Sequence, residues 1–251
     1  MESQHENLWG YLKRLHFVQH VIAESFSYRS ADSLRVLDVG CGNGSELALP
    51  LARLGFQVTG IDIHAPSIEH ARLLGVDVSN VSYVCGPVEE LKSPPYDVVI
   101  LSEVLEHLRE PRLLLSAAVE HLNTNGIIIV TVPNGYGEFE IDSWLFRMFH
   151  LQRVIDVIAR NNTQVTAATD NHESGHVQFF TRRQLRRLFA DCSLSVFREG
   201  VASFLAGPFI GHTLARSDRF IEWNARVTDK LPRVLASGWY FALRRQTEPN
   251  P

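Results

Sequence analysis

The chain has few cysteines, no long apolar run and no excess of basic residues. Its 251 residues include only three cysteines, at scattered positions, and this excludes a disulfide framework or a zinc site built from cysteines. No stretch approaches the ~20 apolar residues that a membrane-spanning helix needs. Charged residues interrupt the N-terminus, which therefore lacks the pattern of a signal peptide. We expect a protein of the cytoplasm.

The charge balance disfavours a nucleic-acid partner. Asp and Glu number 28 against 24 Lys and Arg, which gives a formal net charge of -4. Proteins that bind nucleic acid usually carry a clear basic excess. The composition, with 45% hydrophobic and 21% charged residues, is that of an ordinary globular protein.

An alternation of apolar runs and helical stretches predicts the fold. Five apolar runs expected to be strands are 34–39, 57–61, 81–84, 97–101 and 127–132. Two further strands are expected at 194–198 and 239–243. Strands that alternate with helices form a parallel sheet covered on both sides. We therefore predict an α/β, Rossmann-like, doubly wound and mostly parallel seven-stranded sheet with helices on both faces.

The chain is expected to form one domain in three stretches. Residues 1–33 carry an amphipathic helix and form an N-terminal helical cap. Residues 34–134 form the ligand-binding core, and residues 135–251 complete the sheet. The last stretch holds two insertions, one after strand 5 and one between the last two strands. Insertions on the carboxyl side of a parallel sheet are where α/β enzymes recognise ligands.

The most informative segment is the glycine-rich turn V-L-D-V-G-C-G-N-G-S at 36–45. Glycines let the backbone turn sharply and bring its N–H groups close to a ligand. The spacing G-x-G-x-G differs from the G-x-G-x-x-G of dinucleotide enzymes and disfavours a nicotinamide oxidoreductase. Asp38 ends an apolar strand, where a carboxylate is costly unless a cationic ligand or a ligand amine partners it. Asp62 closes the next strand, where a carboxylate can take both hydroxyls of a ribose.

Four blocks in this order resemble the class I S-adenosylmethionine-dependent methyltransferases. The blocks are VLDVGCGNGS (36–45), FQVTGID (56–62), PYDVVILSEVLEH (95–107) and GIIIVTVPN (126–134). The resemblance implies that S-adenosylmethionine is the cofactor. The cofactor-binding residues that it implies are Asp38, Gly40, Cys41, Gly42, Gly44, Asp62, Ile63, Val88, Glu89, Ser102 and Glu103.

The adenine side departs from the pattern of this family. Many relatives have an acid where this chain has Pro87, and that acid binds the adenine amino group. Glu89 or a backbone carbonyl would have to replace it. By the same resemblance, Asp62 would hold the ribose and Ile63 would pack on the adenine.

Acids and histidines after the fourth strand are the expected catalytic groups. Glu103, Glu106 and His107 stand at i, i+3 and i+4, so on a helical turn they would share a face. His107 or His176 would act as the base for an oxygen acceptor, and Glu106 would orient the loop. Carboxylates with imidazoles also suit a divalent metal, and E-x-x-E-H with a later histidine resembles metal-using O-methyltransferases. Whether a metal binds is left open. If one does, its candidate ligands are Glu103, Glu106, His107 and His176.

The acceptor is the least determined part of the function. A small-molecule O-methyltransferase in biosynthesis, of the ubiquinone-pathway type, is favoured. An N- or C-methyltransferase, an RNA 2′-O-methyltransferase and a non-catalytic methyltransferase-like subunit are the alternatives. Aromatic-rich segments at 202–209 and 239–241 leave room for a lipophilic acceptor or peripheral membrane contact, or else belong to the core. The arginines of 182–187 are expected to form a solvated helix face. The oligomeric state is not predicted.

Overall fold

The computed structural model of the protein describes residues 6–7, 10–135, 177–205 and 217–246. Its centre is a seven-stranded sheet in the order β3-β2-β1-β4-β5-β7-β6. The strands are β1 (Arg35–Val39), β2 (Gln57–Asp62), β3 (Val81–Cys85), β4 (Tyr96–Ser102), β5 (Leu122–Pro133), β6 (Leu194–Val201) and β7 (Gly238–Arg245). Strand β7 is antiparallel to both of its neighbours, β5 and β6, whereas β1 to β5 pair in parallel. The predicted mostly parallel, doubly wound sheet is confirmed.

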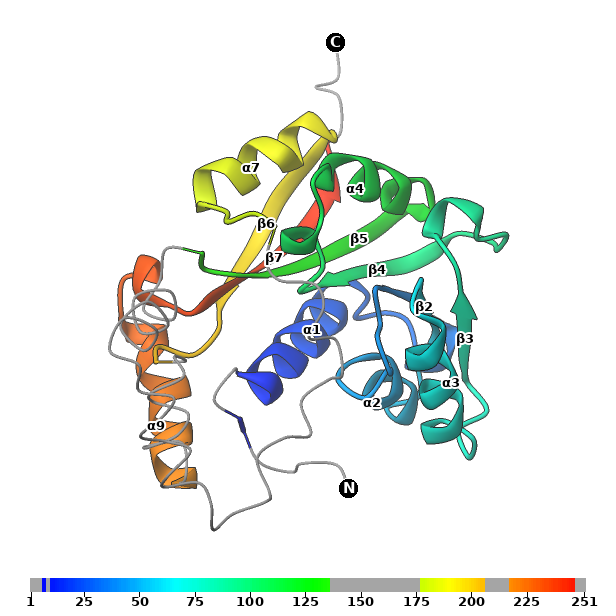
Figure 1. The fold of residues 1–251 in the computed structure, drawn as a ribbon, viewed down its shortest axis with the longest axis horizontal. Helices are drawn as coiled ribbons and strands as arrows, with labels where there is room; N and C mark the ends of the chain where they lie inside the picture. The colour runs from blue at the N-terminus through cyan, green and yellow to red at the C-terminus, as the bar shows by residue number, and fades with distance from the viewer. Residues whose placement is uncertain (1–5, 8–9, 136–176, 206–216, 247–251) are drawn as a thin grey trace.

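Helices cover both faces of this sheet (Figure 1). Helices α1, α2 and α3 pack on one face, and α4 and α7 pack on the other. The bounds are α1 (Tyr11–Ser25), α2 (Ala48–Arg53), α3 (Ala65–Leu74), α4 (Pro111–Glu120), α7 (Arg182–Asp191) and α9 (Asp218–Val227). Short 3₁₀ turns are η1 (Ala31–Ser33), η2 (Val88–Glu90), η3 (Leu105–His107), η5 (Thr228–Lys230) and η6 (Arg233–Leu235). Within the described ranges, no helix is both long enough and apolar enough to cross a membrane.

Each face of the sheet has its own hydrophobic core. One cluster joins the sheet to α4 and α7 and includes Leu115 and Phe189. The other joins the sheet to α1, α2 and α3 and includes Leu51 and Ile68. The apolar run at 127–132 is buried along its length and contributes to both clusters. Alternate side chains of a strand point to opposite faces, so a strand covered by helices on both sides is apolar throughout.

Strand β5 begins before the apolar run at 127–132 that predicted it, because residues 122–126 also belong to the strand. Tyr96 of β4 pairs with Leu122, whereas Val98 pairs with Ile127, so the register shifts between these two pairs. The extra residues of β5 are accommodated as an irregularity in the ladder rather than as a separate turn.

The two predicted insertions are only partly described. Most of the first one, residues 136–176, lies outside the described residues, and His176 with it. The described part of the second contains α9, η5 and η6. The aromatic residues at 239–241 lie in β7 and are buried, which places them in the core.

The carboxyl ends of the central strands meet at one edge of the sheet. Val39, the last residue of β1, lies opposite Ile61 of β2 and Leu101 of β4. Ser102, the last residue of β4, lies opposite Thr131 of β5. The strand order reverses between β1 and β4, and such a switch point is where open α/β sheets bind ligands.

Candidate functional site

The glycine-rich turn follows β1 at this switch point. Gly40, Gly42 and Gly44 have positive φ angles of 71°, 55° and 72°, a left-handed conformation that favours glycine. A Cβ on Gly44 would lie 2.5 Å from Tyr83 Oη, so packing alone requires glycine there. A Cβ on Gly42 would have no atom within 4 Å. Gly42 therefore faces open space, where a ligand can approach the backbone.

Asp62, at the end of β2, holds this turn in place. Its Oδ2 accepts a hydrogen bond from the Gly42 N–H at 2.9 Å, and its Oδ1 accepts one from the His64 N–H at 2.8 Å. The preceding carbonyl, Ile61 O, accepts the Cys41 N–H at 3.1 Å. Asp62 therefore binds the turn and fixes its shape, and its contact with a ribose stays a prediction.

The residues expected on the adenine side follow β2 and β3. Ile63 is 78% exposed, although large apolar side chains are usually buried. Val88 is buried, and its carbonyl accepts a hydrogen bond from His121 Nε2 at 2.8 Å. Glu89 is exposed on the 3₁₀ turn that follows Pro87. The exposed Ile63 and Glu89 are the two side chains here that a ligand can reach directly.

Asp38 is a buried carboxyl group, and the protein itself provides its partners. It is 3% exposed, and the Ala48 N–H donates a hydrogen bond to it. Burial raises the pKa of Asp38 to about 7, although the nearby Arg14 guanidinium opposes the shift. Asp38 thus has a backbone amide as a partner within the protein and a guanidinium nearby, and a ligand amine as a further partner stays a prediction.

Arg14 of α1 is a site residue that the sequence reasoning missed. It is 7% exposed, forms an ion pair with Glu46, and its Nη1 lies 3.8 Å from Glu103 Oε1. Burial by itself lowers the pKa of Arg14, but the carboxylates of Glu46 and Glu103 outweigh it and raise the pKa. Its Nε is buried with no hydrogen-bond partner among the described residues. Arg14 lies four residues before Val18 and seven before Val21, which are on the buried side of α1. This helical spacing is the sequence signal that could have identified Arg14 as a buried residue.

The segment after β4 does not form the predicted helical face. The 3₁₀ turn covers only Leu105–His107, and Glu103 precedes it with a φ of 54°. Glu103 Oε1 accepts the Thr131 hydroxyl at 2.7 Å, and the Ser102 and Thr131 hydroxyl oxygens lie 2.9 Å apart. Glu103 is therefore fixed by β5, whereas Glu106 and His107 belong to the turn.

Glu106 is a buried acid in the middle of the sheet edge. It is 2% exposed, and neither carboxyl oxygen has a hydrogen-bond partner among the described residues. Burial raises its pKa well above the usual value, and the neighbouring Glu103 raises it further. His107 Nε2 lies 3.8 Å from Glu106 Oε1. The main-chain carbonyl of Glu106 accepts the Val177 and Gln178 N–H groups at 3.0 Å and 3.2 Å, so the chain returns to Glu106 after the insertion.

The expected metal ligands are only partly brought together. In the described part of the chain, no group of three or more His, Cys, Asp and Glu side chains is placed to hold a metal ion. Glu106 and His107 are adjacent, and Glu103 uses one carboxylate oxygen for Thr131. His176 lies outside the described residues.

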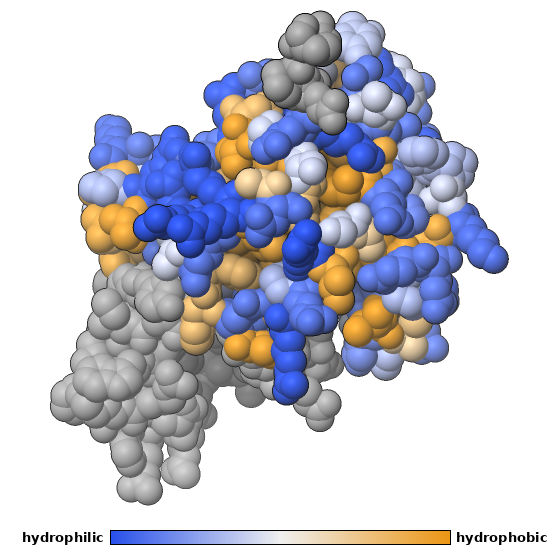
Figure 2. All heavy atoms as spheres, turned by 90° about the horizontal axis from the view of Figure 1, so that it is seen from above, coloured by the Kyte–Doolittle hydropathy of each residue, from blue (hydrophilic) through white to orange (hydrophobic). Residues whose placement is uncertain are grey.

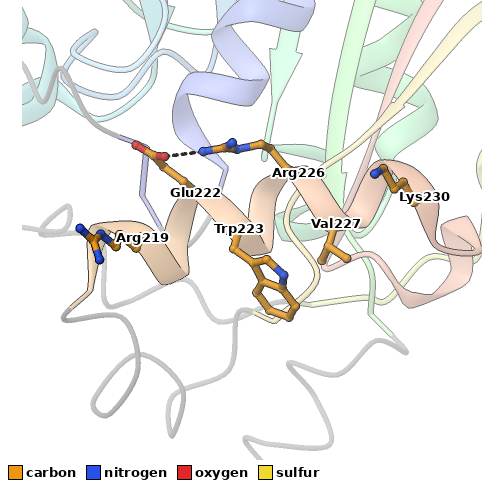
Figure 3. Close-up of a pocket in the computed structure, with 6 residues that line it drawn as sticks. All are labelled: Arg219, Glu222, Trp223, Arg226, Val227 and Lys230. Atoms are coloured by element: carbon orange, nitrogen blue, oxygen red, sulfur yellow. Dashed lines mark hydrogen bonds and ion pairs between the residues drawn. The ribbon is translucent and has the colours of Figure 1, made fainter.

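A separate cavity of about 300 Å³ lies along α9. Its lining residues are Arg219, Glu222, Trp223, Arg226, Val227 and Lys230. Figure 3 shows Trp223 and Val227 on one side of the helix, with the Glu222–Arg226 ion pair on another. None of the predicted cofactor or catalytic residues lines this cavity, so we place the chemistry at the switch point.

The high pKa of Asp38 predicts how stability depends on pH. A free aspartate has a pKa of about 3.9, so between about pH 4 and about pH 7 the folded protein binds this proton more readily than the unfolded chain. The contribution of Asp38 to stability therefore falls as the pH rises through this window. Asp38→Asn is expected to unfold at higher urea than the wild type at about pH 8 and to show a weaker pH dependence, since Asn stays neutral. Parallel wild-type and Asp38→Asn profiles of unfolding free energy against pH would contradict this.

Comparisons with known sequences place this chain in a family. A family profile described as a methyltransferase domain matches residues 11–197. A ubiquinone biosynthesis O-methyltransferase from Rickettsia canadensis (strain McKiel) is 40% identical over 109 residues, which cover 43% of this chain and 46% of that relative. Another, from Idiomarina loihiensis, is 27% identical over 216 residues, covering 83% of this chain and 81% of the relative. The chain spans about half the length of the first of these relatives.

Solved structures share the fold. A magnesium protoporphyrin IX methyltransferase from Synechocystis PCC 6803 with bound S-adenosylhomocysteine gives a TM-score of 0.58 at 18% identity, covering 94% of this chain and 84% of that one. The [4+2]-cyclase SpnF gives a TM-score of 0.59 at 16% identity, covering 98% and 88%. At these identities the likeness shows the fold alone, and one fold hosts different reactions.

Proposed function

Because the chain belongs to the methyltransferase domain family, we propose that it is an S-adenosylmethionine-dependent enzyme that methylates a hydroxyl oxygen of a small biosynthetic molecule. The observation that carries the proposal is the turn at Gly42. Its backbone is left-handed, its N–H is held by Asp62, and the space that a side chain would fill is open.

The residues around this turn fit the two ends of S-adenosylmethionine. Gly40, Cys41, Gly42 and Gly44 present backbone to the methionine end. Asp62 accepts one backbone N–H at each carboxylate oxygen, and each oxygen keeps a further lone pair for a ribose hydroxyl. The adenine side is made by Ile63, Val88 and Glu89, and the strand-4 side by Ser102 and Glu103.

Arg14 and the acids around it suit the charged groups of the methionine end. Asp38, Glu46 and Glu103 favour a ligand amine or sulfonium. Arg14 lies among these acids, and its Nε has no hydrogen-bond partner in the described part of the chain. We therefore assign Arg14 to the carboxylate of the cofactor. In this arrangement Arg14 faces the carboxylate of the methionine end, and the acids face its amine.

His107 is the proposed base. When bound, S-adenosylmethionine supplies an electrophilic methyl group on a sulfonium, with S-adenosylhomocysteine as the leaving group. His107 receives, at Nε2, the proton that the acceptor hydroxyl loses as its oxygen takes the methyl group. Burial raises the pKa of Glu106 and so favours its protonated form, and its carboxyl group lies beside His107 and positions it. Alignment and exclusion of water supply much of the rate in such a displacement.

The sequence also left open whether the enzyme uses a divalent metal in addition to S-adenosylmethionine. The described donors do not form a metal site by themselves, since Glu106 is buried and Glu103 is bound to Thr131. We therefore propose that His107 acts without a metal. His176 remains a second candidate for the base.

The acceptor is proposed to be a lipophilic dihydroxy aromatic compound. The support is the printed function of the curated relatives, which are O-methyltransferases of ubiquinone biosynthesis. Action on such an acceptor brings the enzyme to a membrane surface, so peripheral membrane contact is part of the proposal.

Transfer of a radiolabelled methyl group tests this function. Incubation with methyl-labelled S-adenosylmethionine and a prenylated catechol is expected to yield a mono-O-methylated product, and the same catechol without its prenyl chain is expected to react more slowly. Activity is expected to persist with a chelator. Loss of activity with a chelator would contradict a metal-free reaction and favour a metal held by the four candidate ligands. Binding of S-adenosylhomocysteine without transfer to any hydroxyl would favour an N- or C-methyltransferase or a non-catalytic subunit.

A further inference from the structure

Three arginines surround one buried acid at the β6 side of the sheet edge. Arg182, Arg186 and Arg233 all form ion pairs with Glu199. The Glu199 side chain is 7% exposed, whereas those of Arg182, Arg186 and Arg233 are 33%, 55% and 50% exposed. The arginines of 182–187 are therefore not simply a solvated helix face, because two of them are turned to a carboxylate on β6.

This cluster carries an excess of positive charge. Burial by itself raises the pKa of Glu199, but Arg186 and Arg182 outweigh it and hold the pKa below its usual value. Glu199 is thus ionised at neutral pH and balances one of the three guanidinium groups. No second acid forms an ion pair with these arginines among the described residues. Within the described residues, two positive charges of the cluster are therefore left without an acid.

The arginines of this cluster also have N–H groups that can donate hydrogen bonds to a ligand. Arg182 Nε is buried, and no hydrogen-bond partner for it lies in the described ranges. The side chains of Arg186 and Arg233 are half exposed. Each guanidinium has five N–H donors, so a ligand can reach some of them. Arg182 is the first residue of α7, whose N-terminus is capped by Thr181, and the helix dipole adds to the positive potential there.

Distant elements fix the positions of these arginines. Arg182 and Arg186 are one turn apart on α7, and Glu199 pairs with Phe241 in the β6–β7 ladder. The Arg233 carbonyl accepts the Trp239 Nε1–H at 2.8 Å, which anchors η6 to β7. Figure 2, which views the molecule from the side where α7 lies in Figure 1, shows a broad hydrophilic area over this region.

We propose that Arg182, Arg186 and Arg233, held by Glu199, form a binding site for a phosphate monoester. A phosphate monoester carries close to two negative charges at neutral pH, which matches the two uncompensated guanidinium groups. Its three terminal oxygens accept several charge-assisted hydrogen bonds, and arginine forks bind such oxygens in pairs. A carboxylate would neutralise only one of the two charges. None of these three arginines is among the residues proposed for the cofactor or for methyl transfer.

Calorimetry with glycerol 3-phosphate tests the site. The wild type is expected to bind it at low ionic strength, since half-exposed charges are screened by salt. Arg186→Gln and Arg233→Gln are each expected to weaken binding about tenfold or more, and the double variant is expected to lose it, since each removes charge-assisted hydrogen bonds. Binding of S-adenosylhomocysteine should stay unchanged in all of them.

The matched control is Arg187→Gln. Arg187 is exposed on the same helix and lies outside the cluster. It is expected to bind glycerol 3-phosphate like the wild type. Equal weakening by Arg187→Gln, or no binding by the wild type, would overturn the proposal.

Vesicles distinguish the two sources of a phosphate monoester. Phosphatidylcholine vesicles that contain phosphatidic acid present the same group on a membrane, and pure phosphatidylcholine vesicles do not. Binding only to the phosphatidic acid vesicles, lost in the double variant, would identify a lipid headgroup. Binding of glycerol 3-phosphate without vesicle binding would identify a soluble ligand.

Discussion

Replacing Gly42 by valine is expected to abolish the binding of S-adenosylhomocysteine and to leave the chain folded. A Cβ at this position has no described protein atom within 4 Å, so the added side chain starts in open space and the fold is expected to tolerate it. Its φ of 55° adds backbone strain of about 1–2 kcal/mol. The same side chain fills the space through which the cofactor would approach the turn. Calorimetry with S-adenosylhomocysteine and a thermal melt measure the two effects separately.

Two other glycines serve as controls for this result. Gly55 also has a positive φ, 100°, and a Cβ there would lie 3.7 Å from Ala31 Cβ, away from the turn. Gly55→Ala is expected to lose stability and to keep full binding. Gly44→Ala is expected to disturb the fold, because its Cβ would lie 2.5 Å from Tyr83 Oη. Full binding by Gly42→Val would show that the cofactor does not approach this turn.

Replacing His107 by alanine is expected to reduce kcat for methyl transfer to the catechol by about 10²–10⁴-fold, the usual contribution of a general base. His107 follows the buried Glu106 on η3, and 31% of its side chain is exposed, so an acceptor can reach it. The dissociation constant of S-adenosylhomocysteine is expected to stay the same. The pH dependence of kcat should also lose the limb that reports deprotonation of the base.

Glu106→Gln separates the role of His107 from that of its neighbour. Because burial raises the pKa of Glu106 and so favours its neutral form, a neutral amide of similar shape is expected to retain most of the activity. His20→Ala is the matched histidine control, since the His20 side chain is 68% exposed on α1. If His107→Ala changed kcat little and Glu106→Gln lowered it strongly, His107 would not be the base. Glu106 or a metal would then take that role.

The sequence by itself determined the architecture and the position of the glycine-rich turn. Apolar runs such as 127–132 mark buried strands, and the alternation of strands and helices restricts the topology to a doubly wound sheet. The spacing of Gly40, Gly42 and Gly44, with an acid at the end of each of the first two strands, marked the turn. These signals are local, because they depend on backbone conformation and on the burial of neighbouring residues.

Only the tertiary structure decided which side chains meet across the molecule. Arg14 of α1 lies beside the acids of the turn, and Glu106 is buried without a hydrogen-bond partner in the described residues. Arg233 joins the arginines of α7 on Glu199. The charge state of such groups depends on desolvation and on partners distant in sequence. Periodicity assigns a residue to a face of its own helix or strand, whereas the packing of several elements determines what that face contacts.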